Sequence, residues 1–277
     1  MKKLCVFHGN CADGFTSAWV VRKALGDDVD FHPGVYNNTP PPVEGRDVLM
    51  VDFSYKRPVL EQIRDQANSV LILDHHETAE ADLKDLPGVQ SVFDMKRSGC
   101  RITWDYYFPG VKPPALLLHV EDRDLWRFAL RKTREIQASV FSYPYDFKAW
   151  DFLMEQADPE KLAIEGEAIE RKHFKDIREL IGVVTREFTI GGHKVKVANL
   201  PYTLTSDAAL MLAKDAAFGG CFWFTPEGWV FSLRSTEGGL NVAQIAKEYG
   251  GGGHKHAAGF RIPLDKLSDF CEELKAK

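Results

Sequence analysis

The chain has 277 residues, of which 44% are hydrophobic and 27% are charged, and its formal net charge at pH 7 is −5. This length allows one large domain or two of ordinary size, and the composition is typical of a globular protein. The acidic balance argues against a long nucleic-acid groove, which needs a basic field. It still allows a short anionic substrate held by a few local cations.

No apolar run approaches the roughly 18 residues of a membrane span, and the N-terminus lacks a signal-peptide pattern. The five cysteines are scattered and none forms a CxxC pair. Their odd number favours reduced thiols over a disulfide or zinc framework. We therefore expect a cytoplasmic protein without a membrane partner.

Short apolar runs alternate with helical patterns over the first half of the chain. Ser98 suits a helix N-cap, whereas His32-Pro33 and the prolines at 40–42 indicate irregular chain. Such alternation implies right-handed βαβ units, so we expect an α/β domain over residues 1–157, with helices flanking a parallel sheet. The predicted strands are residues 3–7, 48–51, 70–73 and 91–94, and the helices between them are residues 15–25 and 57–67.

Two further helices are predicted in the middle of the chain. Pro113 and Pro114 open one that leads to the acidic segment 121–124. Asp158 followed by Pro159 places an N-cap before a proline at the first helical position, and a charged segment follows. We assign residues 158–187 to a linker helix, whose charges are the usual solvated face.

The pattern changes near residue 188, where short strands and turns begin. Gly191-Gly192 predicts a hairpin turn between residues 188–190 and 195–197. Residues 221–224 and 229–233 are expected to pair, and a helix over 242–249 precedes four glycines. These features predict a smaller α+β domain over residues 188–277.

Polar side chains follow three of the predicted strands. Because parallel strands place their carboxyl ends at one edge of the sheet, where ligands bind in open α/β folds, we expect these side chains to converge. Buried Asp-His pairs also occur as plain structure, but here several segments show the same pattern. The residues are His8 and Asp13 after the first strand, Asp52 after the second, Asp74, His75 and His76 after the third, and Asp122 and Asp124 near a later helix end.

Several carboxylates this close cannot all stay ionised unless cations lie between them. Oxygen ligands mixed with imidazole suit Mn²⁺, Fe²⁺ or Zn²⁺, and a set rich in aspartate leans towards Mn²⁺. Two such ions that share a bridging carboxylate are used for phosphoester hydrolysis. The sequence therefore predicts a divalent-metal site at this edge.

The glycines at 250–253 and the following His254 allow two interpretations. Glycines after a helix usually form a helix stop or a flexible loop. They also leave backbone N–H groups bare for a phosphate or base, and a helix opened at Ala257 would add its dipole. Arg234, at a predicted strand end, could clamp a phosphate or stack on a base.

On these motifs the chain resembles the DHH–DHHA1 phosphoesterases, a family of single-strand exonucleases, oligoribonucleases that also act on 3′-phosphoadenosine 5′-phosphate (pAp), and cyclic-dinucleotide phosphodiesterases. The resemblance covers nearly the whole chain. Its motifs are His8…Asp13-Gly14, Val51-Asp52, Leu73-Asp74-His75-His76, Asp122 in Glu-Asp-Arg-Asp-Leu-Trp, and Leu233-Arg234-Ser235…Gly250-Gly251-Gly252-Gly253-His254…Ala257-Ala258-Gly259.

The resemblance implies two divalent ions, Mn²⁺ above all, with Asp52 bridging them. Asp74 would orient an imidazole, and His76 would face the scissile phosphate. The implied metal ligands are His8, Asp13, Asp52, His75 and Asp122. The implied substrate-binding residues of the second domain are Arg234, Gly251, Gly252, Gly253 and His254.

The chain also departs from the family pattern. Cys11 occupies the place of an aspartate that many members carry, so Asn10, water or Cys11 would complete the first coordination sphere. Asp124 competes with Asp122 for the fourth motif, and Asp122 is preferred because Trp126 then matches the aromatic that usually follows. Arg101 and Arg123 are cations near the site, for which an exposed or paired side chain is the usual interpretation and a phosphate contact is the alternative.

The function that this resemblance implies is that of a Mn²⁺-dependent phosphodiesterase, which would cut short oligoribonucleotides or dinucleotides such as pGpG into mononucleotides, using water activated by two metals. Hydrolysis of cyclic dinucleotides or of pAp is the first alternative. A non-catalytic protein that senses nucleotides or metals, with a degraded first metal site, is the second. The expected partner is a short RNA or dinucleotide, and a homodimer is compatible with the sequence.

Overall fold

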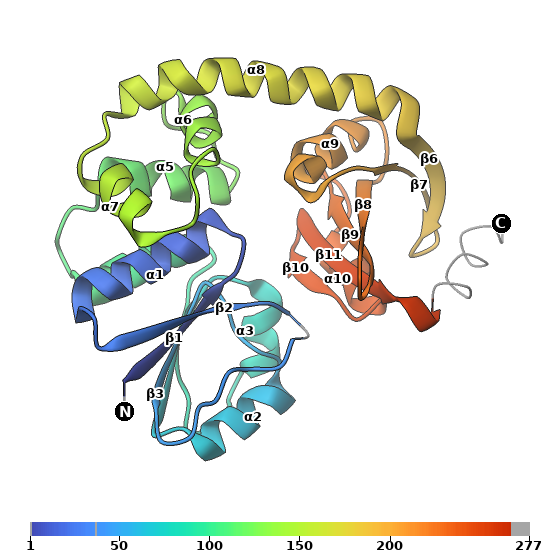
Figure 1. Cartoon of the computed structure of the whole chain (residues 1–277). Helices are drawn as coiled ribbons and strands as arrows, with labels where there is room; N and C mark the ends of the chain where they lie inside the picture. Colours follow the sequence, from blue (N-terminus) through green and yellow to red (C-terminus); the bar gives the residue numbers. More distant parts are fainter. Residues whose placement is uncertain (1, 37, 267–277) are drawn as a thin grey trace. The chain divides into compact units, whose positions relative to one another are not determined.

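The computed structural model describes residues 2–36 and 38–266 (Figure 1). The chain divides into two compact units, Met1–Glu170 and Arg171–Lys277. The boundary lies inside one long helix, α8 (Pro159–Val184), which the charged segment after Asp158 predicted. The two units therefore share the segment that the sequence assigned to a linker.

A five-stranded parallel sheet forms the centre of the first unit, as the alternation of strands and helices predicted. The strand order is β2-β1-β3-β4-β5, and every neighbouring pair is parallel. The carboxyl ends of β1, β3 and β4 consequently lie side by side. The strands are β1 (Lys3–His8), β2 (Val29–Gly34), β3 (Asp47–Val51), β4 (Ser69–Asp74) and β5 (Gln90–Phe93).

The prediction of irregular chain at His32-Pro33 is wrong, because both residues belong to β2. This strand pairs only with β1 and so lies at the edge of the sheet. A proline cannot donate a hydrogen bond to a neighbouring strand, but an edge strand has one side where no donor is needed. Pro33 is therefore tolerated within β2.

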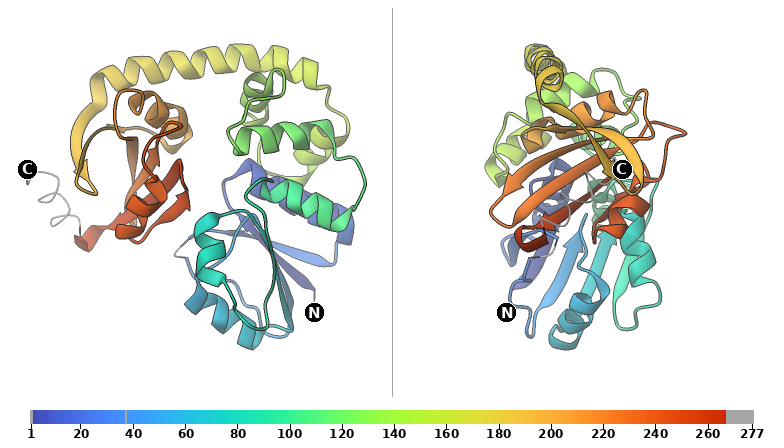
Figure 2. Two further views of the ribbon diagram at one scale, coloured as in Figure 1. Left: turned by 180° about the vertical axis from the view of Figure 1, so that it is seen from behind. Right: turned by 90° about the vertical axis from the view of Figure 1, so that its right-hand side faces the viewer.

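Helices cover both faces of this sheet, and alternate residues of β1 enter different cores. Cys5 and Phe7 pack with α1 and with helices α4 to α7. Leu4 and Val6 pack with α2 and α3 on the opposite face (Figures 1 and 2). These helices are α1 (Ala12–Leu25), α2 (Arg57–Gln66), α3 (Glu77–Leu83), α4 (Gly99–Tyr107), α5 (Ala115–Asp124), α6 (Thr133–Val140) and α7 (Phe147–Glu155).

Two glycines let helices α1 and α4 approach the ends of the strands closely. A Cβ atom on Gly14 would lie 2.3 Å from the carbonyl oxygen of His8. A Cβ atom on Gly99 would lie 2.4 Å from the Cβ of Asp52. The absence of side chains at these two positions brings the first turns of both helices against the edge of the sheet where the predicted metal ligands lie.

The second unit contains a six-stranded sheet with the order β10-β11-β9-β8-β7-β6. The predicted hairpins β6–β7 and β8–β9 are confirmed as antiparallel pairs, and β7 and β8 are parallel. Helix α10 packs on one face, and α9 with the end of α8 packs on the other. The elements are β6 (Thr185–Ile190), β7 (His193–Asn199), η1 (Tyr202–Leu204), α9 (Thr205–Leu212), β8 (Gly219–Thr225), β9 (Gly228–Arg234), α10 (Val242–Glu248), β10 (Gly252–His254), β11 (Ala257–Pro263) and η2 (Leu264–Lys266).

The helix that the sequence suggested at Ala257 is a strand in the structure. Residues from Ala257 onward form β11, which pairs with β9 and β10. Alternate side chains of β11, those of Ala258, Phe260 and Ile262, are buried. This two-residue period is that of a strand. Across residues 2–36 and 38–266, no helix combines the length and apolar character needed to cross a membrane.

Candidate metal centre

Four of the five predicted ligands converge at the carboxyl ends of β1, β3 and β4, and these are His8, Asp13, Asp52 and His75. Among the described residues of the first unit, two groups of three side chains have potential ligand atoms within 4.8 Å of one another, and Asp52 belongs to both. One carboxylate shared between two groups is the arrangement expected of a ligand that bridges two cations. The groups are His8, Asp52 and His76, and Asp13, Asp52 and His75.

Asp52 has the environment of a metal ligand. Its side chain is 1% exposed, and neither carboxylate oxygen has a hydrogen-bond partner among the described residues. Nε2 of His75 lies 3.1 Å from Oδ1, and Nδ1 of His8 lies 3.4 Å from Oδ2. The backbone is left-handed, with φ of 54°, which costs a non-glycine residue about 1–2 kcal/mol. A strained, buried carboxylate that faces two imidazoles fits a cation-binding role.

Asp52 and the histidines beside it shift one another's pKa values. Burial alone would raise the pKa of Asp52, but the imidazoles of His75 and His8 outweigh burial and hold the pKa well below its usual value. Burial alone would lower the pKa of His75, yet the carboxylates of Asp124, Asp52 and Asp13 raise this pKa well above its usual value. The two imidazoles therefore favour the ionised form of the Asp52 carboxylate.

Burial and neighbouring negative charges raise the pKa of two other carboxylates, those of Asp13 and Asp124. Burial raises the pKa of Asp13 well above its usual value, and the charges of Asp52 and Asp124 add to this rise. The pKa of Asp124 is also raised by burial, against the attraction of His75. The raised pKa values reflect repulsion between buried negative charges, which divalent cations would relieve, so the donor set fits two such ions.

Asp13 has a second contact, which the sequence did not indicate. Its Oδ2 accepts a hydrogen bond of 2.7 Å from the N–H of Gly99, and its Oδ1 accepts one of 3.0 Å from the N–H of Cys100. Asp13 therefore caps the N-terminus of α4. Ser98 occupies the predicted N-cap position, but its hydroxyl makes no capping bond and lies 3.3 Å from Sγ of Cys100.

The structure reverses the preference between Asp122 and Asp124. Oδ2 of Asp124 lies 3.4 Å from Nε2 of His75. The carboxylate of Asp122 instead accepts hydrogen bonds from the N–H groups of Ala129 and Leu130, at 2.9 and 3.1 Å, and from the Thr133 hydroxyl at 2.6 Å. The Asp122 carboxylate therefore stabilises the loop after α5. Asp124 takes its place in the candidate ligand set.

Asp74 orients His76, as expected. Its Oδ1 lies 2.7 Å from Nδ1 of His76 and accepts a hydrogen bond of 2.7 Å from the N–H of His75. Burial would raise the pKa of Asp74, but the charge of His76 outweighs burial and lowers it. The ring of His76 is thus fixed beside the cluster by an ionised carboxylate.

The other candidates of the first unit contribute less to the cluster. Asn10 is an exposed residue with φ of 56° in the turn before α1. Cys11 follows it at the N-cap of α1, and burial, with the charge of Asp52 next, raises the pKa of its thiol well above the usual value. Within the described residues, Cys11 belongs to no three-ligand group. Arg101 is paired with Asp105 at 3.0 Å.

Tyr36 was missed by sequence reasoning and lies against the cluster. Its ring centroid is 5.6 Å from that of His8, 6.3 Å from that of His76 and 4.9 Å from that of Phe53. Its side chain is 37% exposed. Tyr36 follows β2, the edge strand that the sequence did not predict, so no pattern in the sequence connected it with the site.

In the second unit, the glycine segment is part of the sheet rather than a bare phosphate loop. The N–H groups of Gly250 and Gly251 donate to the carbonyls of Lys247 and Ala246, at 3.0 and 2.8 Å. Gly252 and His254 lie in β10, which pairs with β11. A Cβ on Gly251 would lie 2.1 Å from the carbonyl oxygen of Gly259. Close packing of strands therefore explains Gly251.

Gly253 has the same explanation, because a Cβ there would lie 2.5 Å from the carbonyl oxygen of Ala257 and φ is 138°. Arg234 ends β9, as predicted. One guanidinium nitrogen donates to the Ser232 hydroxyl at 3.1 Å, and another donates to the Ser206 hydroxyl at 2.9 Å. The Arg234 side chain is consequently held in a fixed orientation.

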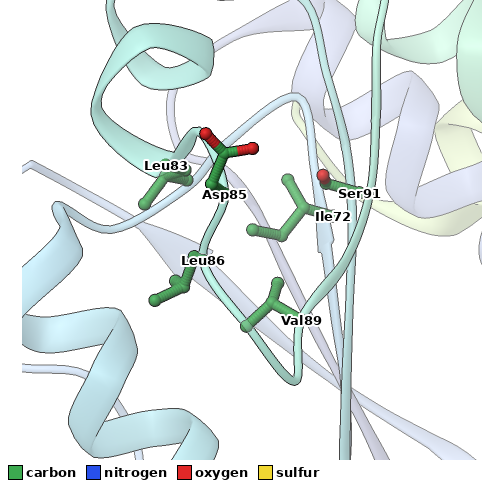
Figure 3. Close-up of a pocket in the computed structure, with 6 residues that line it drawn as sticks. All are labelled: Ile72, Leu83, Asp85, Leu86, Val89 and Ser91. Atoms are coloured by element: carbon green, nitrogen blue, oxygen red, sulfur yellow. The ribbon is translucent and has the colours of Figure 1, made fainter.

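A pocket of about 210 Å³ lies elsewhere in the first unit (Figure 3). It lies on the α2 and α3 side of the sheet, where Ile72 belongs to that core. None of the predicted ligands lines it, so it is separate from the cluster. Its lining residues are Ile72, Leu83, Asp85, Leu86, Val89 and Ser91.

Known proteins resemble this chain over most of its length. Residues 204–277 match the DHHA1 domain model. An uncharacterized protein of Acanthamoeba polyphaga mimivirus is 30% identical, over 95% of this chain and 70% of that protein. The DHH domain of a member of a family of ribosomal proteins has a similar structure, with a TM-score of 0.60 and 12% identity over 99% of this chain and 86% of that chain. RecJ from Thermus thermophilus, solved in complex with Mn²⁺, has a TM-score of 0.54 and 18% identity over 99% of this chain and 52% of that chain.

Proposed function

Because this chain belongs to the DHH–DHHA1 family of metal-dependent phosphoesterases, we propose that it hydrolyses the phosphodiester bond of dinucleotides and very short RNA chains and releases mononucleotides. The observation that carries this proposal is Asp52, which two groups of potential ligands share. Two divalent cations are the proposed cofactors. Mn²⁺ is the first to test, since the donors are oxygen and imidazole.

When bound, the cations would polarise the phosphate and lower the pKa of the attacking water. In this assignment, Asp13, Asp52, His75 and Asp124 would hold one ion, and His8 and Asp52 would hold the other. His76, oriented by Asp74, is left to contact the substrate.

His76 is the residue that we assign to proton transfer. Asp74 holds its Nδ1 at 2.7 Å, which keeps a proton on that nitrogen and leaves Nε2 as the atom to exchange a proton with the leaving oxygen. The ionised Asp74 stabilises the imidazole while it is protonated. In the second unit, Arg234 is the proposed contact for a substrate phosphate, because hydroxyl groups already orient its guanidinium.

Short substrates are favoured by the charge of the chain. A net charge of −5 opposes the accumulation of a long polyanion, whereas a dinucleotide such as pGpG needs only a few local cations. Cyclic dinucleotides and pAp carry similar chemical groups and are the closest rivals. The presence of Cys11 at the first motif also keeps a non-catalytic metal or nucleotide sensor as a rival of a different class.

Turnover with added Mn²⁺ tests this proposal against a panel of pGpG and other dinucleotides, RNA chains of up to six residues, a long single strand, cyclic dinucleotides and pAp. We expect the dinucleotides to be cut most efficiently, and Asp52→Asn to abolish their cleavage. A preference for the long strand or for pAp would refute the substrate assignment. Binding without turnover of any substrate would support the sensor instead.

A further inference from the structure

Two aromatic residues of the loop after α5 stack with arginines from the helices on either side, α5 and α6. Cζ of Arg123 lies 4.1 Å from the ring centroid of Trp126, and Cζ of Arg134 lies 3.8 Å from that of Phe128. The two rings meet edge to face, with centroids 5.1 Å apart. We call these four residues the stacking cluster. Phe141, which is 48% exposed, extends it, with its centroid 5.7 Å from Cζ of Arg123.

The backbone of this loop is strained at both aromatic residues. Trp126 has φ of 55° and Phe128 has φ of 49°, although bulky side chains rarely adopt the left-handed region. Each such residue costs about 1–2 kcal/mol. Strain of this kind persists where the surrounding structure holds it, and it is concentrated at binding and catalytic sites.

Asp122 provides the contacts that maintain the strained loop. Its carboxylate accepts hydrogen bonds from the N–H groups of Ala129 and Leu130. Its carbonyl oxygen accepts bonds of 2.9 and 3.4 Å from the N–H groups of Arg127 and Phe128. The backbone that carries the two rings is therefore held in place by Asp122.

The stacking cluster lies next to the candidate metal centre along the chain. Arg123 directly precedes Asp124, whose Oδ2 is 3.4 Å from Nε2 of His75. The last turn of α5 thus presents a carboxylate to the metal centre and a guanidinium to the rings. A nucleotide with its phosphate at the metal centre carries its base on the adjoining sugar, so a stacking surface beside the centre is suitably placed.

We propose that Arg123, Trp126, Phe128 and Arg134 form a stacking site for one nucleobase beside the scissile phosphate. Guanidinium planes and aromatic rings both stack on bases. The positive charges of Arg123 and Arg134 also attract the phosphates of the substrate. This proposal deepens the proposed function and rests on it. The site selects phosphodiesters that carry a base, largely independently of which base it is.

The test compares a dinucleotide with analogues in which either base is replaced by hydrogen. In Trp126→Leu, we expect the ratio of kcat/KM between the dinucleotide and one abasic analogue to fall about tenfold, chiefly through KM. Trp126→Phe should restore the ratio. Leu130→Ala, an exposed change in the same loop, should keep the wild-type ratio. An equal loss on all substrates in Trp126→Leu would mean that the ring only supports the loop, and would overturn the proposal.

Binding without catalysis separates this proposal from the proposed function. Calorimetry of GMP and of ribose 5-phosphate requires no turnover, so it applies even if no phosphodiester is cut. The wild-type protein should bind GMP more tightly, and Trp126→Leu should remove most of that difference. Equal affinities for the two ligands in the wild-type protein would refute the stacking site. If the protein binds GMP more tightly than ribose 5-phosphate but does not cut dinucleotides, the proposed hydrolysis is refuted and the stacking site is not.

Discussion

Nε2 of His75 lies 3.1 Å from Oδ1 of Asp52, at the point where the neighbouring parallel strands β3 and β4 end. Both side chains are buried, His75 at 2% and Asp52 at 1% exposed. Burial separates these groups from water, so each stabilises the charge of the other. A divalent cation would take the place of the proton between them, which links metal binding to the protonation of this pair.

Asp52→Asn should therefore abolish metal binding in the first unit, because one neutral amide oxygen cannot bridge two cations. Mn²⁺ should raise the melting temperature of the wild-type protein, since a ligand of the folded state stabilises it, and should leave Asp52→Asn unchanged. Asp47→Asn is the matched control on the same strand, where Asp47 pairs with Lys3 at the surface. A normal Mn²⁺ response in Asp52→Asn would contradict the assignment.

Asp122 and Asp124 should respond in opposite ways to the same chemical change. Asp124→Asn should lower the affinity for Mn²⁺ about 10- to 100-fold with little loss of stability. Asp122→Asn should lower the free energy of unfolding by about 1.5–3 kcal/mol, because its carboxylate accepts three hydrogen bonds. Titration with Mn²⁺ and denaturation with urea measure the two effects. The assignment is wrong if Asp122→Asn proves stable but fails to bind metal.

Asp122 and Asp124 also show which part of the site the sequence could not predict. Alternating strands and helices predicted that His8, Asp52 and His75 would meet, because parallel strands share one carboxyl edge. Residues two apart on a helix point about 200° apart, so only one of Asp122 and Asp124 can face that edge. The rotation of α5 decides which one, and it is set by packing that no local pattern encodes.

The glycines of the second unit illustrate the same limit. A run of four glycines is compatible with a bare phosphate loop and with a tightly packed strand. The choice depends on the partner strand, because the close approach to Gly251 comes from Gly259, which is contributed by β11. The position of Tyr36 beside His8 likewise depends on β2, an edge strand containing a proline.

The stability of the first unit should depend on pH through His119. Nδ1 of His119 lies 2.8 Å from the Thr133 hydroxyl, and burial lowers the pKa of His119. A folded-state pKa below the unfolded value of about 6.5 means that the unfolded chain takes up a proton first as the pH falls. The stabilisation is therefore complete above about pH 6.5 and is lost as the pH falls through the folded-state pKa.

His119→Gln removes this proton uptake and keeps a donor for Thr133. The free energy of unfolding, measured with urea at about pH 7.5 and about pH 5.5, should fall less in the variant than in the wild-type protein. At the higher pH the two proteins should be similar in stability. An unchanged pH dependence in His119→Gln would show that His119 has the same pKa in the folded and unfolded states.

Two glycines of helix α8 should respond in opposite ways to the same substitution. A Cβ on Gly166 would lie 1.7 Å from the carbonyl oxygen of Glu135 in α6, whereas a Cβ on Gly182 would have no heavy atom within 4 Å. Gly166→Ala must therefore push α8 away from α6, which should lower the free energy of unfolding of the first unit by at least about 1–3 kcal/mol. Gly182→Ala should raise the free energy of unfolding of the second unit by about 0.5–1 kcal/mol, since alanine is a better helix former than glycine. Urea denaturation of both variants checks the pair, and a Gly166→Ala protein as stable as the wild type would show that the two helices do not pack this closely.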